Sequence, residues 1–127
     1  MQPHERLEID WAKQNKLDYN NMVACSSGTA ALHLACEVAR HELGELRNSM
    51  ISVIPDVTMV ACPRAAAMAG FGRIMFADCG HDLNVDLDDL SSSLRHEDGG
   101  RIPVAMCMAV HVYGRRVNMN RLHESVK

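Results

Sequence analysis

A pair of serines and a Gly-Thr pair stand where an apolar segment gives way to a helical pattern, in the stretch ACSSGTAALHLACEVA over residues 24–39. Both serines are good helix-capping residues, and a glycine lets the backbone approach a ligand without a Cβ in the way. The first amides of such a helix belong to Gly28, Thr29 and Ala30. They lack partners within the helix and lie at the positive end of its dipole, so this turn can seat a phosphate.

The same turn also fits a simpler interpretation, a helix that is only capped after a strand. Neither G-x-G-x-x-G nor G-x-x-x-x-G-K-[ST] occurs here. A phosphate bound at Gly28 would therefore belong to a ligand other than a dinucleotide or a P-loop nucleotide.

Histidine and cysteine do not form a metal-binding pattern. The seven histidines include no H-x-x-x-H pair, and none is clustered with several cysteines at zinc-ligand spacing. The five cysteines are spread singly through apolar segments. This odd count without C-x-x-C indicates free thiols in a reducing compartment, and we expect a cytoplasmic protein with no metal.

The composition argues against nucleic acid as a binding partner and against a membrane-spanning segment. The net charge of −3 over 127 residues leaves no basic stripe for nucleic acid. The apolar runs fall short of the roughly 20 residues that a membrane span needs, and the N-terminus has no apolar signal core.

Strand and helix patterns alternate along the chain, which predicts an α/β fold. A near-continuous apolar run such as IPVAMCMAVHVYG (102–114) is typical of a strand covered on both faces, so we expect a mostly parallel sheet with helices on both faces. In the second expected helix, Leu32, Ala35, Ala39 and Leu43 share one face. The expected helices cover residues 7–14, 29–43, 57–68, 86–95 and 118–127, and the expected strands cover 21–26, 49–55, 72–79 and 102–114.

Four segments together resemble the DegT/DnrJ/StrS family of pyridoxal-phosphate-dependent sugar aminotransferases. They are SSGTAALHLA, VIPDVTMVACPRAAAMAG, FADCGHDLNVDLDDL and VHVYGRRVNMNRL, in the family's order and approximate spacing. The resemblance implies part of the large domain of an aspartate-aminotransferase-type (fold type I) enzyme. It also implies pyridoxal 5'-phosphate as cofactor, with a nucleotide-linked keto sugar and an amino-acid donor, glutamate in most relatives, as substrates.

The resemblance assigns roles to particular residues. Gly28, Thr29 and Ala30 would hold the cofactor phosphate. Met59, in TMVAC, stands where the family has an aromatic residue stacked on the pyridine ring, and its alternative is plain core packing. His111 and Tyr113 of HVYG would line the substrate site, or simply end a strand before Gly114.

Other residues receive lesser roles. Arg64 either faces solvent or meets an anionic substrate group. The carboxylates of the DLNVDLDDL segment are expected to cap and to be solvated: Asp82, Asp86, Asp88 and Asp89.

The resemblance also implies that residues 1–127 form a single incomplete domain, the N-terminal portion of the large domain. Family members are considerably longer, and their Schiff-base lysine and pyridine-binding carboxylate come later in the chain. Lys13, Lys16 and Lys127 match no such motif, so we expect this piece alone to be inactive and the whole protein to form a homodimer. Two alternatives stay open: a same-fold sugar dehydratase or inactive homologue, and an unrelated phosphate-binding α/β module.

Overall fold

The computed structural model describes the backbone of all 127 residues and every side chain except that of Arg47. The chain forms two compact units, residues 1–31 (the N-terminal unit) and residues 32–127 (the C-terminal unit). Each unit is described by itself.

The N-terminal unit is built around α1 (Pro3–Asn15), followed by a short 3-10 turn, η1 (Tyr19–Asn21). Lys16 takes a left-handed conformation with φ of 55° and ends α1. The expected strand at residues 21–26 is wrong, because this segment pairs with no strand among the described residues. An apolar pattern predicts an extended chain, but a strand also requires a hydrogen-bonded neighbour.

The next helix, α2 (Gly28–Leu43), starts one residue before the expected position. Cys36, and not Ala35, is its buried residue, and Leu32, Ala39 and Leu43 pack beside it at the edge of the core. Positions 32, 36, 39 and 43 follow the helical period more closely than the face expected from the alanines.

The C-terminal unit contains a three-stranded sheet in the order β2-β1-β3, with both pairs parallel. The strands are β1 (Ile51–Pro55), β2 (Ile74–Ala77) and β3 (Val104–Cys107). Every residue of β1 is buried. The expected α/β fold with a parallel sheet is confirmed.

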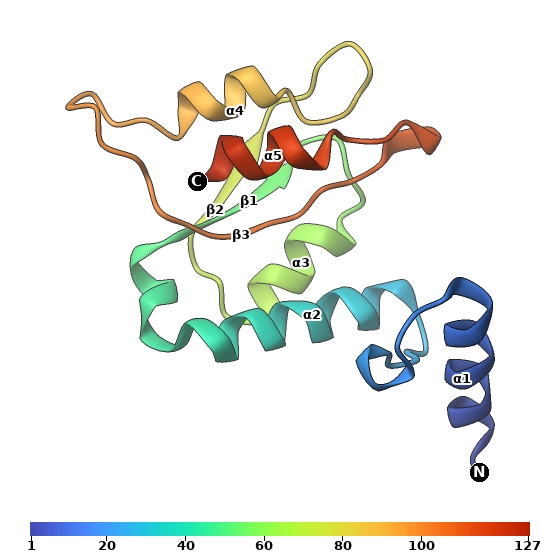
Figure 1. The fold of residues 1–127 in the computed structure, drawn as a ribbon. Helices are drawn as coiled ribbons and strands as arrows, with labels where there is room; N and C mark the ends of the chain where they lie inside the picture. Colours follow the sequence, from blue (N-terminus) through green and yellow to red (C-terminus); the bar gives the residue numbers. More distant parts are fainter. The chain divides into compact units, whose positions relative to one another are not determined.

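Helices cover both faces of this sheet (Figure 1). Ile51 and Val53 point into a core shared with α4 (Leu87–Ser93) and α5 (Met119–Val126). Ile54 points the other way, into a core shared with α2 and α3 (Ala61–Met68). The alternation of neighbouring residues between two cores is the two-fold period of a buried strand.

The helix expected over residues 7–14 begins four residues earlier, at Pro3, where proline suits the first position of a helix. A proline also explains two further differences from the expected boundaries. The helix expected from residue 57 begins at Ala61, because Pro63 lacks an amide and is tolerated only in the first helical turn. The strand expected over 102–114 ends at Cys107. Its neighbour β1 ends at Pro55, which has no amide to donate to a longer ladder.

Among the described residues, no helix is long and apolar enough to cross a membrane.

Candidate functional site

The start of α2 forms a capped turn with free amides; we call residues 26–30 the serine-glycine turn. The Ala30 amide donates to Ser27 Oγ at 3.1 Å, and the Ala31 amide donates to the Ser27 carbonyl at 3.0 Å. No acceptor within the described part of the chain meets the amides of Gly28 and Thr29, and both residues are exposed. Two unpaired donors thus face outward at the positive end of a helix.

Gly28 is not required by the packing of this chain. A Cβ placed on it would meet no atom within 4 Å, and its φ is not positive. The open space beside its backbone is what a phosphate group at this turn would occupy. The free amides and the missing side chain therefore fit the phosphate of pyridoxal phosphate.

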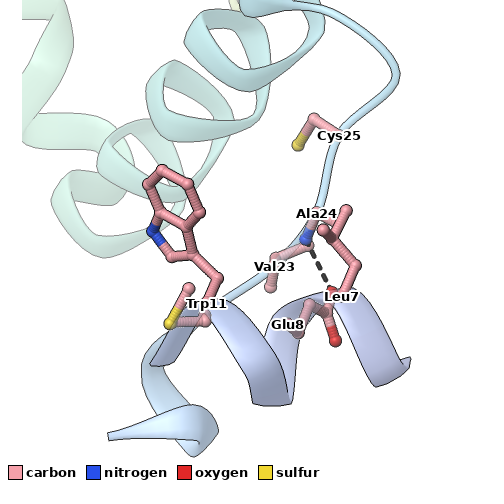
Figure 2. A pocket seen from close by; sticks show the side chains of 7 residues that line it. Leu7, Glu8, Trp11, Val23, Ala24 and Cys25 are labelled. Atoms are coloured by element: carbon pink, nitrogen blue, oxygen red, sulfur yellow. Dashed lines mark hydrogen bonds between the residues drawn. The ribbon is translucent and has the colours of Figure 1, made fainter. Parts of the chain in front are cut away.

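Residues 22–25, which lead into this turn, are hydrogen-bonded to α1 (Figure 2). Glu8 Oε1 accepts a 2.6 Å hydrogen bond from the Ala24 amide. Together the helix and the segment enclose a hollow of about 370 Å³, with the side chain of Trp11 at one side. It is lined by Leu7, Glu8, Trp11, Met22, Val23, Ala24 and Cys25. No spacing in the sequence signals the Glu8 contact, which spans 16 residues.

A second hollow lies in the C-terminal unit, just beyond the carboxyl ends of β1 and β3. This strand-end cavity has a volume of about 370 Å³. The structure brings Met59, His111 and Tyr113 together around it. The full lining is Val57, Thr58, Met59, Val110, His111, Val112 and Tyr113. Ligands of parallel α/β sheets bind at such strand ends.

Met59 and Tyr113 are available to a ligand, because 74% and 90% of their surfaces are exposed. Met59 is thus not a core residue in this structure. Tyr113 has a left-handed backbone, with φ of 49° and ψ of 39°. For a residue with a side chain this conformation costs about 1–3 kcal/mol, a cost that often accompanies a functional site.

His111 has a defined tautomer. The buried Val117 donates its amide to His111 Nδ1 at 3.1 Å. A nitrogen that accepts a hydrogen bond carries no proton, so the imidazole has its proton on Nε2 and can donate from there.

Asn84 holds the same turn from another loop, and nothing in the sequence analysis selected it. Its Oδ1 accepts a 3.2 Å hydrogen bond from the Val112 amide, and Asn84 itself is 4% exposed. Its Nδ2 donates to Asp82 Oδ2 at 2.9 Å, and its backbone amide donates to Asp82 Oδ1. These two bonds hold the pKa of the Asp82 carboxyl below its usual value, and the side-chain bond has the larger effect.

The remaining candidates behave as structural residues. Asp86 caps α4 by accepting from the amides of Asp88 and Asp89, as expected. Asp88 also pairs with Arg121 at 2.6 Å. Arg64 is exposed. Within the described residues, no three His, Cys, Asp or Glu side chains are grouped to hold a metal ion.

The sequence matches the DegT/DnrJ/EryC1/StrS aminotransferase family over residues 5–126. The chain belongs to this family. The alternative of an unrelated phosphate-binding module is therefore set aside.

One solved structure, that of CalS13, agrees with the family. The sugar aminotransferase CalS13 from Micromonospora echinospora is 26% identical and superposes with a TM-score of 0.75 over 98% of this chain. The match covers 31% of CalS13, so the chain spans about a third of that protein's length. Spr1654 from Streptococcus pneumoniae, assigned as a sugar aminotransferase and solved in its PLP-form, is 13% identical with a TM-score of 0.49, covering 98% of this chain and 34% of Spr1654. Among curated protein sequences, none matches.

Proposed function

We propose that residues 1–127 are the N-terminal portion of the cofactor-binding large domain of a pyridoxal-phosphate-dependent aminotransferase. The whole enzyme would transfer an amino group from an amino acid, glutamate, to a nucleotide-linked keto sugar. The observation that carries this proposal is the strand-end cavity, which joins Met59 to His111 and Tyr113 where a parallel sheet binds ligands. Family membership and the likeness to CalS13 support it.

The residues of this chain have complementary roles in binding. The free amides of Gly28 and Thr29 hold the phosphate, with Thr29 adding a hydroxyl donor. The Ala30 amide, also expected to bind it, donates to Ser27 Oγ in this structure and contributes by closing the turn. Met59 covers one face of the pyridine ring through its polarizable thioether. His111 and Tyr113 line the substrate side of the strand-end cavity, where the Nε2 proton of His111 is available to an acceptor.

Bound pyridoxal phosphate supplies the electron sink that amino-group transfer requires. The reaction also needs a lysine that bonds the cofactor and moves a proton. Neither Lys13 nor Lys16, both exposed on or beside α1, stands in a matching motif. We infer that the lysine belongs to a later part of the family fold, so residues 1–127 alone do not transaminate. The active protein would be a cytoplasmic homodimer.

Met59 favours a second candidate function in the same family, a sugar dehydratase with histidine in place of the lysine. A methionine provides no aromatic stacking surface, so the cofactor is held differently from the usual aminotransferase. The residue at the Schiff-base position distinguishes the two functions.

Borohydride reduction of the purified natural protein tests the proposal. We expect pyridoxal phosphate to be fixed on one lysine outside residues 1–127, found by mass spectrometry of peptides. Binding of cofactor without any reducible bond would favour the dehydratase. Fixation on Lys13, Lys16 or Lys127, or no cofactor binding at all, would contradict the proposal.

A further inference from the structure

The turn that carries Tyr113 has little packing of its own. Tyr113 is 90% exposed and its backbone is left-handed, so side-chain contacts do not determine where it lies. Two longer-range hydrogen bonds fix the turn: Val117 donates to His111 Nδ1, and Val112 donates to Asn84 Oδ1. Of these two bonds, only the one to Asn84 connects the turn to a residue outside the 111–117 segment.

Asn84 is suited to this task because its own orientation is fixed. It is 4% exposed, and Asp82 accepts from both its side-chain Nδ2 and its backbone amide. A carboxylate accepts but does not donate, so it selects the amide nitrogen and leaves Oδ1 for Val112. The Asn84 carbonyl also accepts from the Gly80 amide at 2.9 Å, which closes the loop that presents it.

We propose that Asn84, oriented by Asp82, is a positioning residue that sets the place of the Tyr113 turn on the strand-end cavity. It acts through Val112 and does not itself line that cavity. The positioning role of Asn84 does not depend on the proposed function. Only the identity of the ligand in the cavity rests on it.

Two tyrosines, Tyr19 and Tyr113, allow a direct measurement on the chain. In the natural protein labelled with 3-fluorotyrosine, Tyr113→Phe and Tyr19→Phe assign the fluorine NMR resonances of these two residues. We expect Asn84→Ala to change the position and the linewidth of the Tyr113 resonance, because the turn loses its bond to Asn84, and to leave the Tyr19 resonance in place. An unchanged Tyr113 resonance would overturn the proposal.

Asn84→Asp separates positioning from general damage, since it keeps an acceptor for Val112 but sets a carboxylate against Asp82. It should displace the Tyr113 resonance, and the exchanged pair Asp82→Asn/Asn84→Asp should restore it, because the amide then donates from position 82. Failure of the exchanged pair to restore the resonance would count against the proposal, even if Asn84→Ala does not fold. Asn48→Asp is the matched control: Asn48 also donates to a carboxylate, that of Glu45, but it is exposed.

Cofactor titration of the natural protein links this effect to the site. We expect Asn84→Ala to weaken pyridoxal phosphate binding about fivefold, as the loss of one hydrogen bond would do, and the exchanged pair to recover it. Equal affinity in wild type and Asn84→Ala would overturn the link to the cavity. Absence of binding in the wild type would instead contradict the proposed function, and the fluorine result would still decide the positioning role.

Discussion

The amide of Ala24 donates a 2.6 Å hydrogen bond to Glu8 Oε1, which ties the segment before the serine-glycine turn to helix α1. The free amides of Gly28 and Thr29 follow four and five residues after Ala24 along the chain. If the Ala24 contact is lost, the Gly28 and Thr29 amides should therefore sample a wider range of positions, and these are the donors that we assign to the phosphate. Glu8 is a support for the turn and not a ligand.

Replacing Glu8 with alanine should free this segment. Loss of the bond is worth about 1 kcal/mol, so the Ala24 amide should exchange its hydrogen about five times faster. Glu8→Gln keeps an oxygen acceptor and should stay close to the wild type. Equal exchange rates in Glu8→Ala and wild type would show that the contact does not order the segment.

Ser52 and Ser125 are both buried serines, and they should respond in opposite directions to alanine. Ser52 is the second residue of β1, and its Oγ has no hydrogen-bond partner among the described residues. Ser125 Oγ donates to the Leu87 carbonyl at 3.3 Å. Removing an unsatisfied hydroxyl stabilises a fold by about 1 kcal/mol, and removing a satisfied one destabilises it by a similar amount.

Urea unfolding of Ser52→Ala and Ser125→Ala measures this difference. The midpoint should rise for the first variant and fall for the second. A fall of similar size for both would mean that Ser52 Oγ has a partner in solution.

Sequence patterns predicted those elements of the fold whose formation depends on residues close together in the chain. The strand expected at residues 49–55 contains β1 (Ile51–Pro55), and Asp86 was correctly assigned as a cap. The strand expected near residues 21–26 failed, because pairing depends on a neighbour that the pattern does not reveal.

The residues of the candidate site also differ in whether a local sequence motif could reveal them. Met59, His111 and Tyr113 were selected by the family resemblance, and the structure brings them to one cavity. Asn84 was missed because its bond to Val112 spans 28 residues. The D-x-N spacing of Asp82 and Asn84 is a local signal of a side-chain turn, but it does not indicate which distant amide the asparagine would accept.

Burial raises the pKa of the Cys107 thiol to about 11. An unfolded thiol ionises near 8.5, so between about 8.5 and 11 the unfolded chain releases a proton that the folded chain keeps. The contribution of this thiol to stability is full below that window and is lost as the pH rises through it.

Unfolding of wild type and Cys107→Ala across this pH window checks the linkage. The wild type should lose stability more steeply with rising pH than the variant. Parallel curves would indicate that Cys107 is not buried in solution. Exposed Cys25 should react with iodoacetamide well before Cys107 at mildly alkaline pH.

An aromatic residue at position 59 should strengthen cofactor binding. Met59 is 74% exposed and lines the strand-end cavity, so Met59→Trp adds a stacking surface without disturbing the core. Stacking contributes about 0.5–1.5 kcal/mol, so the Kd for pyridoxal phosphate should fall about twofold to tenfold. Val60→Trp is the control, because Val60 is equally exposed but does not line the cavity. The same gain in both variants would contradict the role of Met59.

Titration of wild type and Gly28→Val with pyridoxal phosphate tests the central claim most directly. Gly28 is exposed and a Cβ built on it has no atom within 4 Å, so we expect the valine side chain to extend into solvent and the variant to fold. Its side chain would stand where the phosphate binds, so its affinity should fall at least about tenfold, a loss of about 1.4 kcal/mol. Inorganic phosphate should compete with the cofactor in the wild type. Equal affinity in a folded Gly28→Val protein, or no competition by phosphate, would contradict the assignment of this turn as the phosphate site.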